Sequence, residues 1–529
     1  MSQPTGGKSV GFYLAFLSLS LYAFTHALET TIFPISLPSI QDDFAASTVQ
    51  YFWANSIFLL LTVLTQPLVT SLSNIFGRTY LLYSCLLLFA AGAALVGAAS
   101  NIYILIVGRL IQGIGGGGVD VLTEIIVTDI TSLKERAFYV GLLNIPTALG
   151  SVLGPVLGGA FSTYVTWRWV AWIDLPLLGV GAVLSVFFLR LKPVDMSSRM
   201  KWERVDWLGM ALFVIGSTAT VCSLSWGGVL YPWRSWQTYV PLTIGPLVLV
   251  VLAFHEYRTE DAMFPHRILA GKTSGCCMLG SLIHGLITAA VIYILPLYFQ
   301  GVQQESPIES AISAFPFSFL AVPSGSVAAF LVTYFSQYNW IMWIGWAAIS
   351  LGVGIMSLLD LKSSRSVQLG LQVPGGIGVG ILYTIISIPL QANVPVDDVG
   401  LAVGTLVFFR LTGQIIGLVI SAAIFSNTYT TRASQWKNLP AIAEKFRDGS
   451  TAVYAIETLS SLNGYPSVKN LILETYAVSL HYVWVALAVI APVALLTSLF
   501  IECKPLNKDE TGRQGFADVR LEEQTSSII

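Results

Sequence analysis

Fourteen long apolar stretches are the feature of this sequence that most constrains its fold. A transmembrane helix needs about 20 mostly apolar residues, and each stretch is close to that length or longer. They lie at residues 11–39, 48–71, 79–99, 102–126, 138–161, 167–190, 206–228, 238–254, 276–299, 311–334, 339–358, 367–390, 401–425 and 479–501. Only 11% of the 529 residues are charged, against about 25% in soluble domains. The sequence therefore predicts an all-α polytopic membrane protein with fourteen transmembrane helices.

The distribution of lysine and arginine predicts which ends of these helices face the cytoplasm. If the N-terminus is cytoplasmic, sixteen of the 27 basic residues fall on its side of the membrane and four fall in short loops on the other side. Cytoplasmic loops carry the excess of basic residues in membrane proteins. We therefore expect both termini to be cytoplasmic. The expected location is the cell membrane, with the vacuolar membrane as an alternative.

An internal repeat relates the first stretches of the chain to later ones. His26 in the first stretch matches His284 in the ninth, and residues 112–126 match residues 372–386 with eight identities. A third match pairs glycines of the fifth and thirteenth stretches, namely Gly141, Gly150 and Gly154 with Gly404, Gly413 and Gly417. The offsets are 258, 260 and 263 residues, and each match spans eight stretches rather than six. This pattern predicts two six-helix halves in parallel pseudo-repeat plus an inserted helix pair, an arrangement typical of transporters.

The repeat divides the chain into four parts. The N-terminal half is expected at residues 1–190, and the inserted pair, with its basic cytoplasmic loops, at residues 191–275. The C-terminal half follows at residues 276–501 and contains a long extracellular loop at 426–478. The last part, residues 502–529, is a charged cytoplasmic tail whose composition predicts disorder.

A glycine-rich sequence in the fifth stretch is the most specific motif of the chain. Residues 150–159 read GSVLGPVLGG and resemble the antiporter motif gxxxGPxxGG of the major facilitator superfamily, in particular its fourteen-span drug:proton antiporters of fungi. The small residues of this motif are Gly150, Gly154, Pro155, Gly158 and Gly159. Residues 108–115 resemble the family's RxxQGxG motif, and residues 28–38 resemble its first-helix motif, in which an acid precedes Thr-Ile. The likeness covers about residues 12–500.

The loop after the second stretch departs from the family pattern. The family motif GxLSDxxGRK corresponds to TSLSNIFGRT at residues 70–79, which lacks the first glycine, the aspartate and the last basic residue. In the family that aspartate helps to latch the two halves together on the cytoplasmic side. The resemblance marks Asn74, Gly77 and Arg78 as the cytoplasmic gating loop. Because Asn74 cannot form an ion pair, the departure puts the latch in question.

Ionisable residues within the apolar stretches are the candidates for a functional site, because burying them in hydrocarbon is costly. Glu29 follows His26 by three residues, which places both on one helix face. A carboxyl group removed from water binds a proton more readily, and imidazole titrates near neutral pH. The candidates for proton coupling or substrate contact are Glu29, His26, Arg109, Asp120, Glu124, His284 and Arg410.

The acids and arginines of this set also have structural interpretations. The resemblance implies that Arg109 transfers protons or acts as a counter-ion, with Glu29 or Asp120 as its partner. The alternative is a fixed ion pair that only holds helices together. For Glu124 the structural alternative is an acid at a helix end near the lipid headgroups.

The histidines and Asp174 are open to two interpretations as well. The first helices of each half line the cavity in this family, so His26 and His284 are expected to face each other across the pseudo-axis. They can relay protons or bind substrate, or serve as structural residues. Asp174 stands where relatives more often carry asparagine, and we expect it to pair with Arg168 near the outer interface rather than to contact substrate.

These features together predict a proton-coupled secondary transporter, an antiporter that exports small amphipathic organic molecules such as toxins, drugs or secondary metabolites by alternating access. The alternatives are proton-coupled uptake of a nutrient or siderophore, and a non-transporting membrane receptor. The sequence contains no GxxxxGK[ST], HExxH or GxSxG motif, so neither ATP drive nor an enzyme is expected. The expected energy source is the proton gradient, without a cofactor or metal. The expected partners are the lipid bilayer and a small-molecule substrate but no nucleic acid, and the chain is expected to be a monomer.

Overall fold

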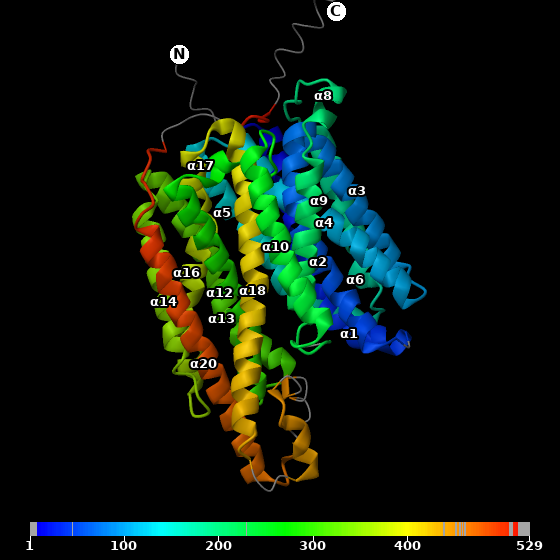
Figure 1. Ribbon diagram of the computed structural model, residues 1–529, viewed down its shortest axis with the longest axis vertical. Coiled ribbons are helices and arrows are strands. Elements are labelled where there is room, and N and C mark those ends of the chain that lie inside the picture. The colour runs from blue at the N-terminus through cyan, green and yellow to red at the C-terminus, as the bar shows by residue number, and fades with distance from the viewer. Residues whose placement is uncertain are drawn as a thin grey trace, which may run out of the picture.

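The computed structural model of the protein describes residues 8–44, 46–228, 230–436, 440–449, 452–453, 456, 459, 462–506 and 512–516. Helices make up nearly all of the regular structure in this part of the chain (Figure 1). Fourteen of the helical segments are long and apolar enough to cross a membrane. The predicted fold class of fourteen transmembrane helices is confirmed.

Six spans form the first set of helices. The fifth of them, α5, contains Pro146 and Pro155. The sixth span is divided into α6 and α7, which meet at Ile173. The helices of this set are α1 (Val10–Asp43), α2 (Thr48–Phe76), α3 (Arg78–Gly97), α4 (Ile102–Ile130), α5 (Leu133–Tyr164), α6 (Trp169–Trp172) and α7 (Asp174–Phe188).

Two spans with short connecting helices separate this set from the last six spans. These intermediate helices are α8 (Ser198–Glu203), α9 (Trp207–Trp226), α10 (Trp236–Arg258) and α11 (His266–Leu269). The last set contains α12 (Lys272–Gly301), α13 (Pro307–Phe335), α14 (Asn339–Met356), α15 (Arg365–Gly370), α16 (Gln372–Ile385), α17 (Ser387–Asn393), α18 (Val399–Ala433) and α20 (Pro466–Ser498).

The packing pattern of the first set recurs in the last set. Helix α1 packs on α5 as α12 packs on α18, and α2 packs on α4 as α13 packs on α16. Helices α3 and α4 form a third pair that is repeated by α14 and α16. The helices that share sequence matches therefore also share neighbours.

Glycines of the antiporter-like motif allow α5 to approach α1 closely. A Cβ atom added at Gly150 or Gly154 would overlap atoms of α1, and one added at Gly158 would lie 2.6 Å from the Ile32 carbonyl oxygen. A Cβ atom at Gly159, by contrast, would meet no atom within 4 Å. Small residues at helix contacts let backbones pack closely in membranes, so three of the four motif glycines have a packing role and Gly159 does not.

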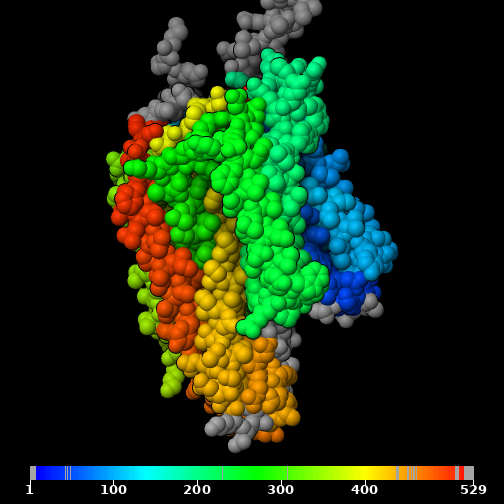
Figure 2. Space-filling model, viewed as in Figure 1, coloured from blue at the N-terminus to red at the C-terminus, as the bar shows by residue number. Residues whose placement is uncertain are grey.

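The inserted helices α9 and α10 lie on the surface of the molecule between the two sets (Figure 2). Helix α9 contacts both α2 and α18. The ring of Phe213 lies 5.4 Å from that of Phe408, centroid to centroid, in an edge-on arrangement. The inserted pair thus spans the boundary between the first and last sets of helices.

The helices that flank the long loop extend beyond the predicted boundaries. Helix α18 continues to Ala433 and α20 begins at Pro466, so the expected loop of 426–478 is shorter at both ends. The extension carries too many polar residues to be recognised as apolar. Every fourth residue of the extension nevertheless lies on one fully buried helix face, namely Phe425, Tyr429 and Ala433. The ring centroids of Tyr429 and Tyr476 on α20 lie 5.0 Å apart. Packing on α20 therefore keeps this segment helical.

The ends of the spans define two sides of the molecule. The side at which α1 begins also holds residues 512–516, because Phe516 and Phe12 have ring centroids 6.0 Å apart. We call this side the termini side. The opposite side contains the connection between α18 and α20 and is called the loop side. It includes the short helix η2 (Ala441–Phe446).

The glycine packing generates a prediction about stability. Replacing Gly154 with alanine places a methyl group against Thr31, and overpacking of this kind costs about 1–3 kcal/mol. We expect Gly154→Ala to lower the apparent melting temperature of the purified protein in detergent. The matched control is Gly159→Ala, whose added methyl group has free space. Equal melting temperatures for the two variants would contradict this assignment of the motif glycines.

Candidate functional site

An arginine buried between α1 and α4 is the centre of the largest charged cluster. Arg109 on α4 forms an ion pair with Glu29 on α1, and the exposed fractions of the two side chains are 2% and 0%. The Arg109 guanidinium carbon also lies 4.0 Å from the Phe33 ring centroid and 4.4 Å from that of Phe58. Of the two partners predicted for Arg109, Glu29 is the one that it contacts.

Asp174 belongs to the same cluster. Its Oδ2 accepts a hydrogen bond of 3.1 Å from Gln112 Nε2, and Gln112 Oε1 accepts one of 3.0 Å from Arg109 Nη1. The carboxyl group of Asp174 neighbours that of Glu29 in this cluster, and Asp174 is fully buried. The first residue of α7 therefore points into the first set of helices.

The predicted pairing of Asp174 with Arg168 is wrong. Arg168 Nη1 donates a hydrogen bond of 2.9 Å to Asp43 Oδ2, at the loop-side end of α1. Trp167 Nε1 donates to the same oxygen, over 2.7 Å. The hydrogen bonds from Trp167 and Arg168 lower the pKa of Asp43. The break between α6 and α7 separates the two residues, so that Arg168 lies near the surface and Asp174 in the interior.

A second pair lies further along α4. His26 Nδ1 is 3.2 Å from Asp120 Oδ1, and Gln66 Nε2 donates a hydrogen bond of 2.8 Å to Asp120 Oδ2. These three side chains come from α1, α4 and α2. Two of the predicted candidates are thus brought together, one turn of α1 away from Glu29.

A third pair joins the two sets of helices. Arg410 Nη2 on α18 donates a hydrogen bond of 2.7 Å to Glu124 Oε1 on α4. The Arg410 guanidinium carbon lies 4.2 Å from the Tyr383 ring centroid. The structural alternative for Glu124, a helix-end acid near the headgroups, is wrong, because the charge of Arg410 on the opposite set draws it into the interface.

The structure does not pair the two matched histidines with each other. His284 is buried, and its Nε2 lies 3.0 Å from the Val379 carbonyl oxygen, within the last set of helices. Its ring centroid is 6.1 Å from that of Tyr383, the residue that also contacts Arg410. His26 forms its ion pair within the first set. Each histidine is therefore bonded inside its own half.

The charges of the candidate site are distributed unequally between the matched helices. The repeat offsets relate Glu29, Arg109, Asp120 and Glu124 to Ile287, Leu369, Gly380 and Thr384. Gln112 and its match Gln372 are both fully buried and hydrogen-bonded, but Gln372 bonds backbone atoms where Gln112 bonds charged side chains. The scaffold is repeated, while these four ionisable side chains have no ionisable counterpart at the matched positions of the last half.

The gating loop is held by an ion pair that does not involve Asn74. Gly77 links α2 to α3 with a φ of +105°, a conformation that favours glycine. Arg78 is buried, and its Nε lies 3.1 Å from Asp129 Oδ2 at the end of α4. Its Nη1 donates to Ser73 Oγ over 2.6 Å, whereas its contact with Asn74 Oδ1 is 3.5 Å long. Asp129 thus supplies the carboxylate that position 74 lacks.

Residues 512–516 of the C-terminal tail pack against this gating loop. Gln514 is buried; its Oε1 accepts a hydrogen bond of 2.8 Å from the Arg78 backbone N–H, and its Nε2 lies 3.4 Å from the Ser73 carbonyl oxygen. The Gly512 N–H donates to the Asp129 carbonyl oxygen over 3.0 Å. The expectation of a disordered tail is wrong for this segment, because it satisfies backbone groups of the loop; residues 507–511 and 517–529 lie outside the described part.

The two sets of helices also meet on the termini side. Arg267 Nε and Nη2 bind the two carboxylate oxygens of Asp398 over 2.7 and 2.8 Å, and these hydrogen bonds raise the pKa of Arg267. Arg136 Nη1 on α5 donates to Gln391 Oε1 on α17 over 3.3 Å. On the loop side, α1 and α20 end far apart (Figure 1). On the termini side, the Arg136–Gln391 bond therefore joins the first set to the last, and the Arg267–Asp398 pair joins the inserted segment to the last set.

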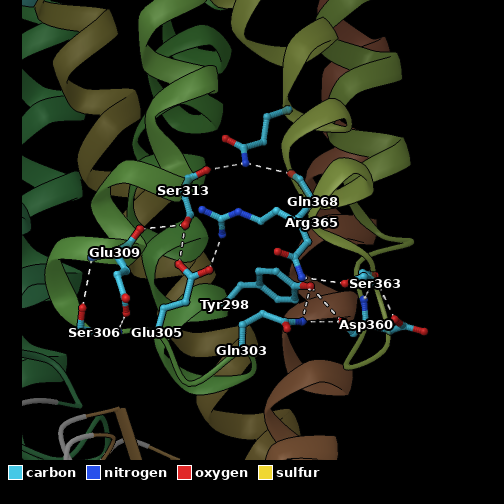
Figure 3. A network of polar contacts seen from close by, with 11 residues as sticks. Tyr298, Gln303, Glu305, Ser306, Glu309, Ser313, Asp360, Ser363, Arg365 and Gln368 are labelled. Carbon is cyan, nitrogen blue, oxygen red and sulfur yellow. Dashed lines mark hydrogen bonds and ion pairs between the residues drawn. The ribbon is translucent and has the colours of Figure 1, made fainter.

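The loop side of the last set is held by a separate polar network, which Figure 3 shows. Arg365 forms an ion pair with Glu305, and Glu305 also accepts a hydrogen bond from Ser313. Tyr298 Oη donates to the Asp360 carbonyl oxygen over 2.9 Å. The network connects α12, α13 and the segment before α15, so this end of the last set is braced on its own.

Two hollows of the described surface lie away from the Glu29–Arg109 cluster. One of about 720 Å³ is on the loop side, where Lys362, Arg432 and Glu474 contribute to its wall. The other, of about 320 Å³, lies between α10 and α18. Among the described residues, no set of three metal-binding side chains lies close enough together to hold an ion.

The docking of Gln514 leads to a prediction. Gln514→Ala leaves the Arg78 N–H and the Ser73 carbonyl oxygen without their partner, and an unsatisfied buried polar group costs about 1–3 kcal/mol. We expect the variant to lower the apparent melting temperature of the full chain in detergent and to speed proteolysis of the tail. Arg513→Ala is the control, because Arg513 is exposed. If both variants melt and are cleaved alike, Gln514 does not anchor the tail.

Comparison with known proteins identifies the family. A model described as Major Facilitator Superfamily matches residues 19–418. The chain is 39% identical over 520 residues to the MFS-type transporter sphD of Aspergillus fumigatus, covering 98% of this chain and 90% of that protein. It is 35% identical over 483 residues to efflux pump FUS6 of Gibberella fujikuroi, covering 90% and 86% of the two chains. An acurin A biosynthesis cluster MFS-type transporter of Aspergillus aculeatus is 34% identical over 505 residues, covering 95% and 91%.

Solved structures share the fold. The proton:xylose symporter XylE matches with a TM-score of 0.56 and 13% identity, covering 94% of this chain and 98% of that one. The human organic anion transporter MFSD10 matches with a TM-score of 0.56 and 16% identity, covering 89% and 100%. The chain therefore belongs to the Major Facilitator Superfamily, and its relatives include fungal efflux pumps.

Proposed function

We propose that this transporter is a proton-coupled antiporter that exports small amphipathic organic molecules, such as toxins or secondary metabolites, by alternating access. The observation that carries the proposal is the buried cluster of Glu29 and Arg109, in which the side chains of an acid and a guanidinium are 0% and 2% exposed. Ionisable residues placed within membrane spans are costly and mark ion or proton pathways. The names of fungal relatives, which include an efflux pump and a biosynthesis-cluster transporter, support export of a metabolite.

The orientation of the transporter in the membrane is proposed from the excess of basic residues on the termini side, which assigns that side to the cytoplasm. The bonds between the halves then close the cytoplasmic side, and the described conformation corresponds to the state that is open to the outside. A proton entering from outside neutralises the Glu29 carboxylate, and it is released to the cytoplasm when the termini side opens. One charge moved through 100 mV is worth about 2.3 kcal/mol, which can drive a substantial substrate gradient.

The Glu124–Arg410 pair gives this cycle a point of contact between the halves. It is one of the bonds that must break when the termini side opens, because its two residues belong to different sets. Breaking a buried ion pair without replacing its partners costs about 3–5 kcal/mol. Substrate or water entering between the halves is proposed to supply those partners.

The remaining parts of the proposal concern the membrane location, oligomeric state, energy source and partners of the protein. The chain acts as a monomer in the cell membrane, or in the vacuolar membrane, with both termini in the cytoplasm. It is not an enzyme, requires no cofactor or metal, binds no nucleic acid, and takes its energy from the proton gradient. Its partners are the bilayer and the exported molecule.

Export is tested in the cell that carries the gene. Deleting the gene is expected to raise the intracellular to extracellular ratio of at least one small metabolite, measured by mass spectrometry, and re-expression is expected to restore it. A lowered ratio would indicate uptake of that compound and overturn export. Unchanged ratios for every detected metabolite would overturn the transport of a metabolite.

Coupling is tested with the compound that this experiment identifies. Glu29→Gln keeps a side chain that can bond to Arg109 but cannot bind and release a proton. We expect the variant in vesicles to lose accumulation driven by a pH gradient, at least tenfold, while exchange of labelled for unlabelled compound continues.

The control for coupling is Glu444→Gln, which changes an acid of the loop-side connection that is about half exposed. This variant should accumulate the compound as the unmodified protein does. If Glu29→Gln retains accumulation driven by the pH gradient, Glu29 is not the coupling acid.

A further inference from the structure

Two carboxylate oxygens in the buried cluster have no ordinary hydrogen-bond donor. Glu29 Oε2 and Asp174 Oδ1 are buried, and neither accepts a hydrogen bond from a donor among the described residues. The other oxygen of each group is occupied, by Arg109 Nη1 for Glu29 and by Gln112 Nε2 for Asp174. Buried polar atoms are normally satisfied, so these two oxygens require an explanation.

The position of the two carboxyl groups accounts for both unpartnered oxygens. The two groups are neighbours in one cluster, linked through Arg109 and Gln112, and both residues are fully buried. An ionised carboxylate can only accept hydrogen bonds, so two ionised groups cannot form one between them. Like charges in contact also repel strongly away from water. A single proton between the groups satisfies both oxygens.

The charge surrounding the pair agrees with one bound proton. Arg109 on α4 supplies one positive charge beside Glu29 on α1 and Asp174 on α7. The other titratable group that acts on the Glu29 carboxyl is His26 on α1, and its own partner is Asp120. With both acids ionised the three-residue cluster has a net charge of −1, and with one proton it is neutral.

We propose that Glu29 and Asp174 form a carboxyl pair that holds one exchangeable proton, and that Asp174 is a proton-binding residue of this transporter. When the proton binds, an O–H bond forms on one carboxyl and its hydrogen bond is accepted by the other. When it leaves, the electron pair stays on that carboxyl, and the two negative charges on α1 and α7 repel each other.

This inference rests on the proposed proton coupling for its role in transport, but proton binding itself can be measured without transport. The purified full chain in detergent is titrated with acid and alkali while infrared difference spectra record the carbonyl stretch of protonated carboxylic acids. We expect one component of that band to disappear with rising pH. Either Asp174→Asn or Glu29→Gln should abolish this component, because the asparagine or glutamine amide replaces the shared proton as donor.

The double variant distinguishes one shared proton from two separate ones. If the groups share a proton, Asp174→Asn combined with Glu29→Gln loses no more signal than either change alone, a non-additive result. If each single variant removes half of the component, the acids titrate independently and the proposal is wrong. If the component survives Asp174→Asn unchanged, Asp174 is not part of the site.

Glu256→Gln is the matched control. Glu256 is also buried and also has a carboxylate oxygen without a donor among the described residues, but it lies on α10, outside the cluster. The titrating component assigned to the pair must survive this change. Correct folding of each variant is checked by its size-exclusion profile and melting temperature.

Transport measurements under a pH gradient distinguish a failure of this inference from a failure of the proposed function. If wild-type transport is indifferent to a pH gradient while the titrating component requires both acids, the pair exists and proton coupling is wrong. If wild-type transport follows the pH gradient and Asp174→Asn transports as the wild type does, coupling stands and the proposed pair is wrong. If proton coupling and the carboxyl pair are both correct, Asp174→Asn lowers gradient-driven accumulation at least tenfold. The variant still exchanges labelled for unlabelled compound.

Discussion

The burial of Arg109 between apolar helices is the constraint on which the candidate site depends. A guanidinium away from water must be matched by acceptors and by negative charge, and this requirement brings α1, α4 and α7 together through Glu29, Gln112 and Asp174. The glycines of α5 contribute by letting it approach α1 closely. The antiporter-like motif and the buried charges are thus parts of one packing arrangement. Helix α1 carries Glu29 and is also the helix against which the α5 glycines pack.

Closure of the termini side depends on two further glycines that the sequence repeat relates to each other. A Cβ atom at Gly141 on α5 would lie 2.8 Å from the Ala329 Cβ atom on α13, and one at Gly404 on α18 would overlap Thr70 on α2. The same repeat position therefore serves as the close crossing between the halves on both sides of the pseudo-axis. The two crossings are thus equivalent positions of the repeat, and the Arg136–Gln391 hydrogen bond joins the same two sets of helices on this side.

The spans were predictable from the sequence because each must carry its own apolar run, and the matched glycines were predictable because close packing leaves a local trace. The partners of the buried charges were not. Asp174 follows a break at Ile173 whose geometry decides which way the carboxyl points, and no spacing rule describes it. Glu124 and Arg410 are 286 residues apart in the sequence. The ion-pair partner of Arg78 is Asp129 and not the residue at position 74. Gln514 carried no signal at all, since its partners are backbone atoms of a distant loop.

The docking of residues 512–516 has a consequence for how the protein is made. The gating loop lies between the second and third spans and is synthesised early in translation, but the glutamine that satisfies its backbone is synthesised after all fourteen spans. Until then the loop of a nascent chain lacks that bond, so a half-made or truncated product cannot complete it. The hydrogen bonds of the first half's loop are therefore completed only when the chain has been synthesised through Gln514.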